Sequence, residues 1–336
     1  MKNYLLCCDW GTSSFRLRLV KLSDSQIVGE VFTDDGIASI FNSWKKNLEL
    51  GGLNRDQFFR NYLTGQIDIL SAQLSFDLQM VMIVISGMAS SSIGMDEIPY
   101  TNLPYPVDGS QAGMRYFVAR SDFPHDIILI SGVRSETDVM RGEETQLVGL
   151  LTINELLSFR EKEAVFIFPG THSKHMYVSG GNLVGFQTFM TGEVFKIMSN
   201  HSILKDSVEH GKQTEFRGEE IGAFKLGIRQ SGRSSILNSM FRVRTNQLFN
   251  TLGKRENTYY LSGLLIGNEL GYLAKKEKYE LVLCSGNNLY ELYKLGIEEL
   301  NLNERTTTVS ADVIDKATVA GQVKIYQSQT LKLNKI

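Results

Sequence analysis

The chain has 336 residues, of which 42% are hydrophobic, so it is long enough to form two domains with ordinary apolar cores. Its 35 basic and 37 acidic residues form no basic block, which argues against nucleic acid or an anionic membrane surface as a partner. No apolar run reaches the length of about 18 residues that a membrane span needs, and the apolar run before Asp9 is too short for a signal peptide. We therefore expect a cytoplasmic protein. Its three cysteines lie inside apolar runs, as buried thiols do, and whether the chain forms a homodimer stays open.

The first half reads as strands and helices in alternation. Two apolar runs bounded by glycine indicate strands that are buried on both faces, and the segment between them is a long loop holding three of the five prolines. Long irregular loops in compact domains are usually functional. The expected elements are three strands within 4–33, a helix over 44–74, a strand over 78–86, the loop 87–109, a strand over 126–132, and a helix after Gly142.

The second half repeats this plan. Three strands are expected within 164–189, followed by a mostly helical stretch from 191 to 274 with breaks near Gly232 and Gly253. The remaining elements are a strand over 280–285, a helix over 289–300, a short strand near 306–310 and a last helix near 312–326. The repeat predicts a duplicated α/β fold with a cleft between the halves. We place the domains at 1–155, together with a final helix 312–336, and at 156–311.

A turn of similar sequence occurs in both halves. Aligning the two copies pairs Gly11 with Gly170, Thr12 with Thr171, Ser14 with Ser173, and Arg16 with His175. Glycine lets the backbone approach a ligand, and the hydroxyl and N–H groups that follow can hold an anion. Two such turns suit a polyphosphate.

Asp9 precedes the first turn and could orient Mg²⁺ through water, while Thr12, Ser13 and Ser14 donate to phosphate. A single such turn would be explained by hairpin geometry alone, and the second copy makes phosphate binding the better interpretation. In that copy His172 and Lys174 flank Ser173, although Lys174 could also be a solvated surface lysine.

The sequence contains neither a Walker-type motif nor a dinucleotide fingerprint. Gly286 and Asn287 follow the strand 280–285, where a helix start could pack against adenosine; an ordinary turn is an equal alternative.

Acidic residues cluster at the helix start near Gly142. Asp138, Glu143 and Glu144 are candidates for the base that takes a proton from an acceptor hydroxyl, although acids in a first helical turn often serve only as caps. A zinc site at His172 and His175 is disfavoured because no further ligand is near, and the serines at 90–92 lack the frame of a nucleophile.

These residues together resemble the 2-dehydro-3-deoxygalactonokinase family of the sugar kinase and actin superfamily. The similarity covers nearly the whole chain, and DVMRGEETQ (138–146) and PGTHSK (169–174) are its specific blocks. The resemblance implies two actin-like (ribonuclease H-like) domains closing on ATP, and magnesium-dependent phosphorylation of the C6 hydroxyl of 2-dehydro-3-deoxy-D-galactonate in galactonate breakdown. It also implies a carboxylate of the GEE segment as base, and we take Glu143 as the first candidate and Glu144 as the second.

The acceptor is assigned to the long loop and its surroundings. The candidates are Ser90, Ser91, Glu97, Tyr100, Arg134 and Arg141. The chain departs from the family pattern here, with Ser92-Ile93 in place of an Arg-Gln pair and Met95 in place of Trp; His175 replaces an aromatic residue after the second turn. Losing an arginine removes a bidentate partner for a carboxylate unless Arg134 or Arg141 supplies one. Two alternatives therefore stay open: a kinase of this fold for another sugar acid, and an actin-like or chaperone-like ATPase without kinase activity.

Overall fold

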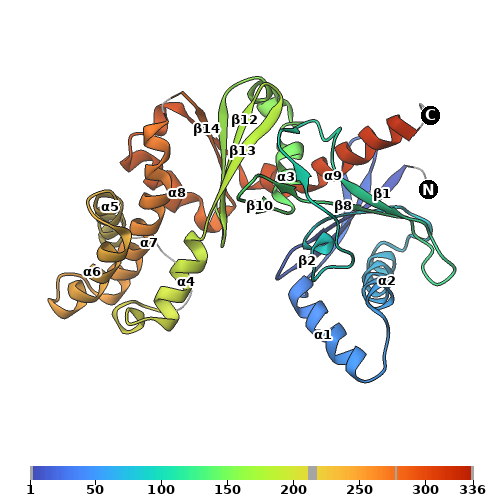
Figure 1. Ribbon diagram of the computed structural model, residues 1–336, viewed down its shortest axis with the longest axis horizontal. Coiled ribbons are helices and arrows are strands. Elements are labelled where there is room, and N and C mark those ends of the chain that lie inside the picture. Colours follow the sequence, from blue (N-terminus) through green and yellow to red (C-terminus); the bar gives the residue numbers. More distant parts are fainter. Residues whose placement is uncertain (1–2, 211–217, 277, 334–336) are drawn as a thin grey trace. The chain divides into compact units, whose positions relative to one another are not determined.

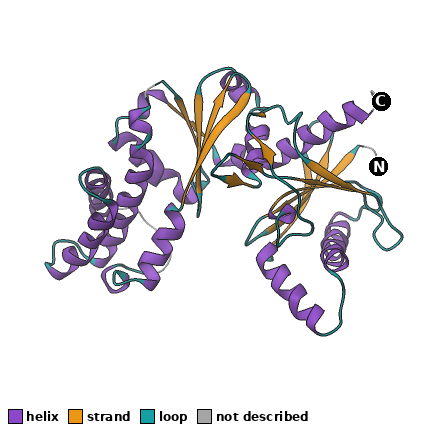
Figure 2. Ribbon diagram, in the orientation of Figure 1, coloured by secondary structure: helices purple, strands orange, loops and turns teal. Residues whose placement is uncertain are grey.

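The computed structural model describes residues 3–210, 218–276 and 278–333. The chain forms two compact units. Unit 1 comprises Met1–Glu161, Ser179–Gly185 and Asp312–Ile336, and unit 2 comprises Lys162–Val178 and Phe186–Ala311. Each unit has its own sheet with helices packed on it (Figures 1 and 2).

The sheet of unit 1 has the strand order β3-β2-β1-β4-β8-β7. β1 pairs antiparallel with β2 and parallel with β4, and β4 pairs parallel with β8. The apolar residues of β1 and β4 are buried on both faces, as their continuous apolar sequence predicts. The strands are β1 (Tyr4–Trp10), β2 (Phe15–Lys21), β3 (Ile27–Thr33), β4 (Ile83–Gly87), β7 (Met114–Phe117) and β8 (Ile127–Ile130).

The sheet of unit 2 has the corresponding order β13-β12-β11-β14-β15. Again the first strand pairs antiparallel with the second and parallel with the fourth, and the fourth pairs parallel with the fifth. The strands are β11 (Ala164–Phe168), β12 (Ser173–Ser179), β13 (Asn182–Phe189), β14 (Glu280–Cys284) and β15 (Thr306–Val309). The shared order and pairing confirm the predicted duplicated α/β fold.

The helix expected over 44–74 is two helices. α1 (Ile37–Glu49) begins earlier than predicted, and α2 (Arg55–Leu74) begins where the Asn54 side chain accepts a hydrogen bond of 3.0 Å from the Gln57 N–H. Between them Gly51 adopts a positive φ of 75°, which ends the helical path. The side chains of α2 that face the sheet join one apolar core with β1 and β4.

The long loop contains short structures that the pattern did not predict. β5 (Thr101–Asn102) pairs with β9 (Val133–Arg134), which also pairs with β10 (Val139–Met140). β6 (Tyr105–Pro106) pairs with the first residues of β13 within unit 1. The expected strand over 78–86 begins only at Ile83, because Met80 takes a positive φ of 61° and turns the chain.

Two helices of unit 1 cross in very close contact. α3 (Glu143–Leu150) is shorter than its apolar pattern suggested, and α9 (Ala311–Leu333) extends beyond its expected limits. A Cβ on Gly149 or Gly321 would overlap backbone atoms of the other helix, so glycine at both positions permits the approach. α9 also contacts the sheet, because the Gln322 side chain donates to the Cys8 carbonyl at 2.7 Å.

Unit 2 is mainly helical outside its sheet. α5 and α7 pack closely through glycines, and α6 packs on α7. The helices are α4 (Thr191–His201), α5 (Gly218–Ser231), α6 (Ile236–Leu248), α7 (Lys254–Gly271) and α8 (Asn287–Glu299). Short 3-10 helices occur in both units. In unit 1 they span Met88–Ser90 and Asn154–Arg160, and in unit 2 they span Lys205–Ser207, Leu273–Lys275 and Asn303–Arg305.

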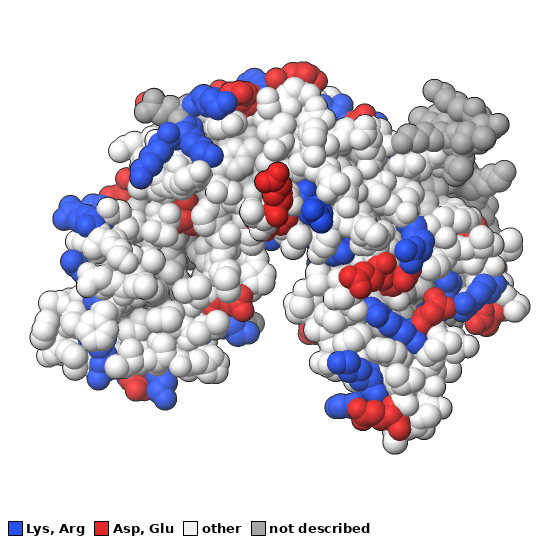
Figure 3. All heavy atoms as spheres, in the orientation of Figure 1, with Lys and Arg blue, Asp and Glu red and all other residues white. Residues whose placement is uncertain are grey.

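Acidic and basic side chains are intermixed on the surface that Figure 3 draws, and the described residues of that face form no broad patch of one sign. Of the helices in the described ranges, none combines the length and the apolar character that crossing a bilayer requires.

Candidate active site

The first turn lies between β1 and β2 and is exposed at its tip. The Gly11 N–H donates to the Ser14 carbonyl at 2.9 Å, which closes the turn and leaves Thr12 and Ser13 exposed. The start of α1 sits directly on this turn, because the Ile37 N–H donates to the Gly11 carbonyl at 2.9 Å. A Cβ on Gly36 would overlap the Thr12–Ser13 backbone. Glycine at 36 therefore allows the helix start to meet the turn.

The second turn repeats this arrangement between β11 and β12. The Gly170 N–H donates to Ser173 Oγ at 3.3 Å, and the Glu193 N–H at the start of α4 donates to the Thr171 carbonyl at 3.0 Å. A Cβ on Gly192 would lie 2.7 Å from the Gly170 carbonyl oxygen, too close for an ordinary contact. Gly192 thus corresponds to Gly36. Sequence analysis missed both, although a glycine where the helix begins after the third strand recurs in each half.

The side chains of the second turn have different surroundings. Thr171 is exposed, whereas Ser173 is fully buried and Lys174 is 5% exposed, so the surface-lysine interpretation of Lys174 is wrong. His172 is half exposed, and its Nε2 lies 2.6 Å from Glu193 Oε2. Thr171 therefore carries the exposed hydroxyl of this turn.

Asp9 is the next-to-last residue of β1, close to the first turn. Within the described ranges, no hydrogen bond is donated to its carboxylate, although its residue is only partly exposed. Burial raises the pKa of Asp9, the positive charges of Arg16 and Arg18 oppose that rise, and the charge of Glu143 adds to it. A carboxylate in this position is stabilised by a cation.

Arg16 contacts a helix of its own unit. Its Nη1 lies 2.7 Å from Asp315 Oδ1 on α9, and Arg18 binds the other oxygen of the same carboxylate at 2.6 Å. The Arg16 side chain is 35% exposed, so binding a phosphate would compete with this ion pair.

The two adjacent glutamates at the start of α3 differ in their contacts. Glu144 is buried, and its carboxylate accepts from the Gly142 N–H at 2.7 Å and from Thr145 Oγ1 at 2.9 Å. Burial, reinforced by the charge of Glu143, raises the pKa of Glu144 to about 8. Glu143 is only partly buried. Asp138, the third candidate, accepts from the N–H of Val139 at 2.7 Å.

Three chain segments of unit 1 meet around Asp9 and Glu143. A Cβ on Gly87, at the end of β4, would lie 2.8 Å from the Trp10 carbonyl oxygen and 3.5 Å from Asp9 Oδ1. A Cβ on Gly142 would lie 3.3 Å from the Gly87 Cα. Both glycines have positive φ, 88° and 107°. These positions bring the start of α3 to the carboxyl ends of β1 and β4.

Arg141 holds the long loop. Its guanidinium donates to Ser90 Oγ at 2.7 Å and to the Ile98 carbonyl at 3.0 Å, and it lies 3.9 Å from the centre of the Tyr100 ring. Arg134 is exposed, and none of the hydrogen bonds among the described residues involves its guanidinium. Of the two arginines, Arg134 is therefore the one available to a carboxylate.

The remaining acceptor candidates divide by exposure. Glu97 is exposed, whereas Ser91 is buried and donates to the Met88 carbonyl at 2.7 Å. At the departures from the family pattern, Ser92 is exposed and Met95 belongs to the apolar core.

Arg55 at the start of α2 also supports this loop, a role that sequence analysis missed. It donates to the Gly94 carbonyl at 2.5 Å and to the Ser92 carbonyl at 2.8 Å, and stacks over Phe41 at 5.3 Å. The loop is thus fixed by an arginine from another segment.

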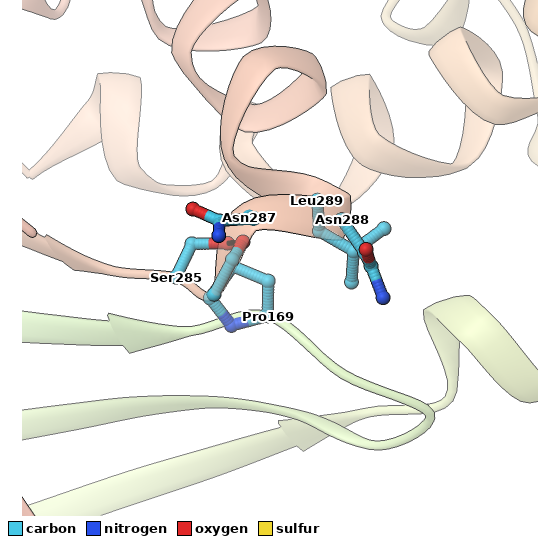
Figure 4. A pocket seen from close by; sticks show the side chains of 6 residues that line it. Pro169, Ser285, Asn287, Asn288 and Leu289 are labelled. Carbon is cyan, nitrogen blue, oxygen red and sulfur yellow. Dashed lines mark hydrogen bonds between the residues drawn. The ribbon is translucent and has the colours of Figure 1, made fainter. Parts of the chain in front are cut away.

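Unit 2 has an open pocket at the carboxyl ends of two parallel strands. Figure 4 shows Pro169, after β11, and Ser285, after β14, beside the first turn of α8. The lining residues are Pro169, Ser285, Gly286, Asn287, Asn288 and Leu289. The carboxyl ends of parallel strands are the usual ligand edge of α/β sheets, and a helix start adds N–H donors. The predicted residues Gly286 and Asn287 both line this pocket.

Sequence and structure comparisons point to one family. The profile of the 2-keto-3-deoxy-galactonokinase family matches residues 9–325. A probable 2-dehydro-3-deoxygalactonokinase of Rhizobium meliloti is 31% identical over 92% of this chain and 93% of the relative. The 2-dehydro-3-deoxygalactonokinase of Escherichia coli is 27% identical over 70% of this chain and 76% of the relative.

A crystal structure of a Sinorhizobium meliloti protein, provisionally assigned as a 2-dehydro-3-deoxygalactonokinase, superposes with a TM-score of 0.75 at 28% identity and covers 96% of both chains. The duplicated fold, the paired turns and these similarities agree. The chain belongs to the 2-keto-3-deoxy-galactonokinase family, a family of carbohydrate kinases.

Proposed function

We propose that the protein transfers the γ-phosphoryl group of ATP to the C6 hydroxyl of 2-dehydro-3-deoxy-D-galactonate. The observation that carries this proposal is the placement of Glu143 near the partly buried Asp9, where the charge of Glu143 contributes to the raised pKa of Asp9. Family membership and the names of the relatives support the reaction class and the acceptor.

ATP binding is assigned to both turns and to the pocket of unit 2. The exposed hydroxyls of Thr12, Ser13 and Thr171 and the N–H groups beside them would donate to phosphate oxygens. The pocket at Gly286 and Asn287 would hold the adenosine, which makes unit 2 the nucleotide-binding domain.

Asp9 fits a magnesium ion, because its carboxylate has no hydrogen-bond donor in the described ranges and Mg²⁺ bound with a nucleotide needs only one or two protein carboxylates. When bound, Mg²⁺ would neutralise charge that develops on the phosphate oxygens.

The reaction needs one base. Glu143 takes the proton of the C6 hydroxyl, whose oxygen forms a bond to the γ-phosphorus while the bond from that phosphorus to the bridging oxygen of ADP breaks. Glu144 is unsuited to this step because it is buried and already accepts two hydrogen bonds from its own helix start.

The acceptor carboxylate is assigned to Arg134, whose guanidinium is exposed, while Arg141 keeps Ser90 and Tyr100 in place. An arginine fork matches the geometry of a carboxylate. The buried thiols of Cys7, Cys8 and Cys284 carry no disulfide, which agrees with our proposal that the enzyme works in the cytoplasm.

The proposal is tested by ADP release from purified protein with ATP, Mg²⁺ and a panel of sugar acids. We expect turnover to depend on the acceptor and to be fastest with 2-dehydro-3-deoxy-D-galactonate. Faster turnover with another acid would identify that acid as the substrate instead. ATP hydrolysis that no acid stimulates would overturn the kinase assignment.

A further inference from the structure

A buried carboxylate in unit 2 connects the second turn to the helices around it. Glu269 on α7 is 2% exposed, and its Oε1 lies 3.0 Å from Nε2 of the fully buried His175. Its Oε2 accepts from the Tyr293 hydroxyl at 2.8 Å and from Thr191 Oγ1. A carboxylate is tolerated at such depth only when its oxygens are satisfied, so this arrangement constrains all four side chains.

The hydrogen-bond directions continue from Glu269 to the turn. Burial, with the nearby charge of Glu269, raises the pKa of Tyr293, so its phenol stays protonated and donates a hydrogen bond to the carboxylate. Ser173 Oγ lies 2.8 Å from the Tyr293 oxygen and must therefore donate to it. A lone pair of Ser173 accepts the Gly170 N–H at 3.3 Å. The single hydroxyl proton of Ser173 is thus used inside the protein.

The Glu269 carboxylate also contacts α4, the helix whose start supports the second turn. Thr191 is the first residue of α4, and two residues later the Glu193 N–H holds the Thr171 carbonyl at 3.0 Å. Tyr293 lies on α8, whose first turn lines the pocket at Gly286. Glu269 therefore braces the second turn from two sides and ties it to the helix of the pocket.

We infer that Glu269 is a positioning residue for ATP: through Tyr293 and Thr191 it fixes the second turn so that Thr171 and the backbone N–H groups face the phosphates. In this arrangement Ser173 supports the turn from within and does not donate to phosphate, which revises the role its sequence position suggested. The inference rests on the proposed nucleotide site.

Tyr293→Phe tests the inference, because it removes the hydroxyl between Glu269 and Ser173 and keeps the ring. We expect the Kd for magnesium-ATP, measured by titration calorimetry, to rise about 10-fold, since a buried polar group loses its partner. The Kd for adenosine, which lacks phosphates, should stay within about twofold. Tyr177→Phe is the matched control, because its hydroxyl contacts Gln187 outside this cluster at 2.9 Å.

Ser173→Ala gives a second, smaller change if Tyr293→Phe does not fold, and it should show the same selectivity for ATP over adenosine. Unchanged ATP binding in the folded variants would overturn the inference, as would an equal loss of ATP and adenosine binding, which indicates general loosening. Absence of ATP binding by the unmodified protein would instead contradict the proposed function.

Discussion

The two turns share a backbone arrangement but are supported by different chemistry. In unit 1 the rings beside the turn form an aromatic cluster, with Trp10 and Phe15 at 5.0 Å and Phe15 and Tyr62 at 5.3 Å between ring centres. In unit 2 the corresponding support is the hydrogen-bonded cluster around Glu269. The arrangement of turn, helix start and close-approach glycine is common to both, so it does not depend on which chemistry supports it.

The turns also differ in the reactive groups near them. Asp9 is the next-to-last residue of β1, whereas the aligned residue of β11 is Phe168. Glu143 belongs to unit 1. This difference is the basis of our proposal that unit 1 supplies the reactive carboxylates, whereas unit 2 holds the adenosine and part of the phosphate chain.

The largest effect expected from this division is that of Glu143→Gln. Removing a general base typically costs about 10²- to 10⁴-fold in kcat. The Kd for ATP should change little, since the proposed nucleotide groups stay in place. Steady-state kinetics and ATP titration check this; a kcat within tenfold of the unmodified protein would remove Glu143 from the role of base.

Glu144→Gln tests the neighbouring glutamate, which we do not assign as the base and whose buried carboxyl group affects stability. The pKa of Glu144 is raised from 4.5 to about 8. The stability that its protonated carboxyl group contributes is therefore fully present below pH 4.5 and is lost as the pH rises from 4.5 through 8. Relative to the unmodified protein, the variant should gain about 3 kcal/mol in free energy of unfolding between pH 5 and pH 8. Urea denaturation at the two pH values measures this gain; equal pH dependence of both proteins would contradict the raised pKa.

Gly36→Ala and Gly192→Ala test whether the helix starts support the two turns alike. Each added methyl group would clash with its turn, at a cost of about 2 kcal/mol and with weaker ATP binding. The effect at Gly36 should be the larger, since its Cβ would come closer to backbone atoms than that of Gly192.

Gly65→Ala and Gly222→Ala are the matched controls in the two units, because a Cβ at either position meets no atom within 4 Å. Both lie inside helices, where alanine is favoured by about 1 kcal/mol. Thermal unfolding and ATP titration distinguish the two pairs, and loss of ATP binding in the controls would show that the effect is not local to the turns.

The smallest effect is expected for Tyr62→Phe, the unit 1 counterpart of Tyr293→Phe. The Tyr62 hydroxyl donates to Asp35 Oδ2 at 3.2 Å and lies 2.8 Å from Thr33 Oγ1 at the edge of the aromatic cluster. Its removal should lower the free energy of unfolding by about 1 kcal/mol and leave the Kd for ATP unchanged, because stacking supports this turn. A rise in that Kd comparable to the rise for Tyr293→Phe would mean that both turns depend on a tyrosine hydroxyl.

Features that depend on local pattern could be predicted from the sequence. The continuous apolar runs around β1, β4 and β11 indicated strands, and the recurring Gly-Thr turns indicated the duplication. Local pattern was insufficient over 44–74, where two helices replace the single one expected. The break at Gly51 could not be seen in the sequence because it does not interrupt the spacing of the apolar residues.

Features that depend on residues far apart in the sequence coming together in the fold could not be predicted. Gly36 and Gly192 matter because a helix start meets a turn more than twenty residues away in sequence, and Arg55 because it reaches carbonyls of the long loop. Glu269 lies within the mostly buried helix α7, yet only the fold brings it to Tyr293 and His175.

The most direct test of the division between the units is one ATP titration of steady-state turnover with Glu143→Gln and Tyr293→Phe side by side. The account predicts opposite outcomes: Glu143→Gln lowers kcat about 10²-fold or more with KM for ATP unchanged, and Tyr293→Phe raises KM for ATP about 10-fold with kcat within about twofold. If both variants changed the same parameter, the assignment of chemistry to unit 1 and nucleotide binding to unit 2 would be contradicted.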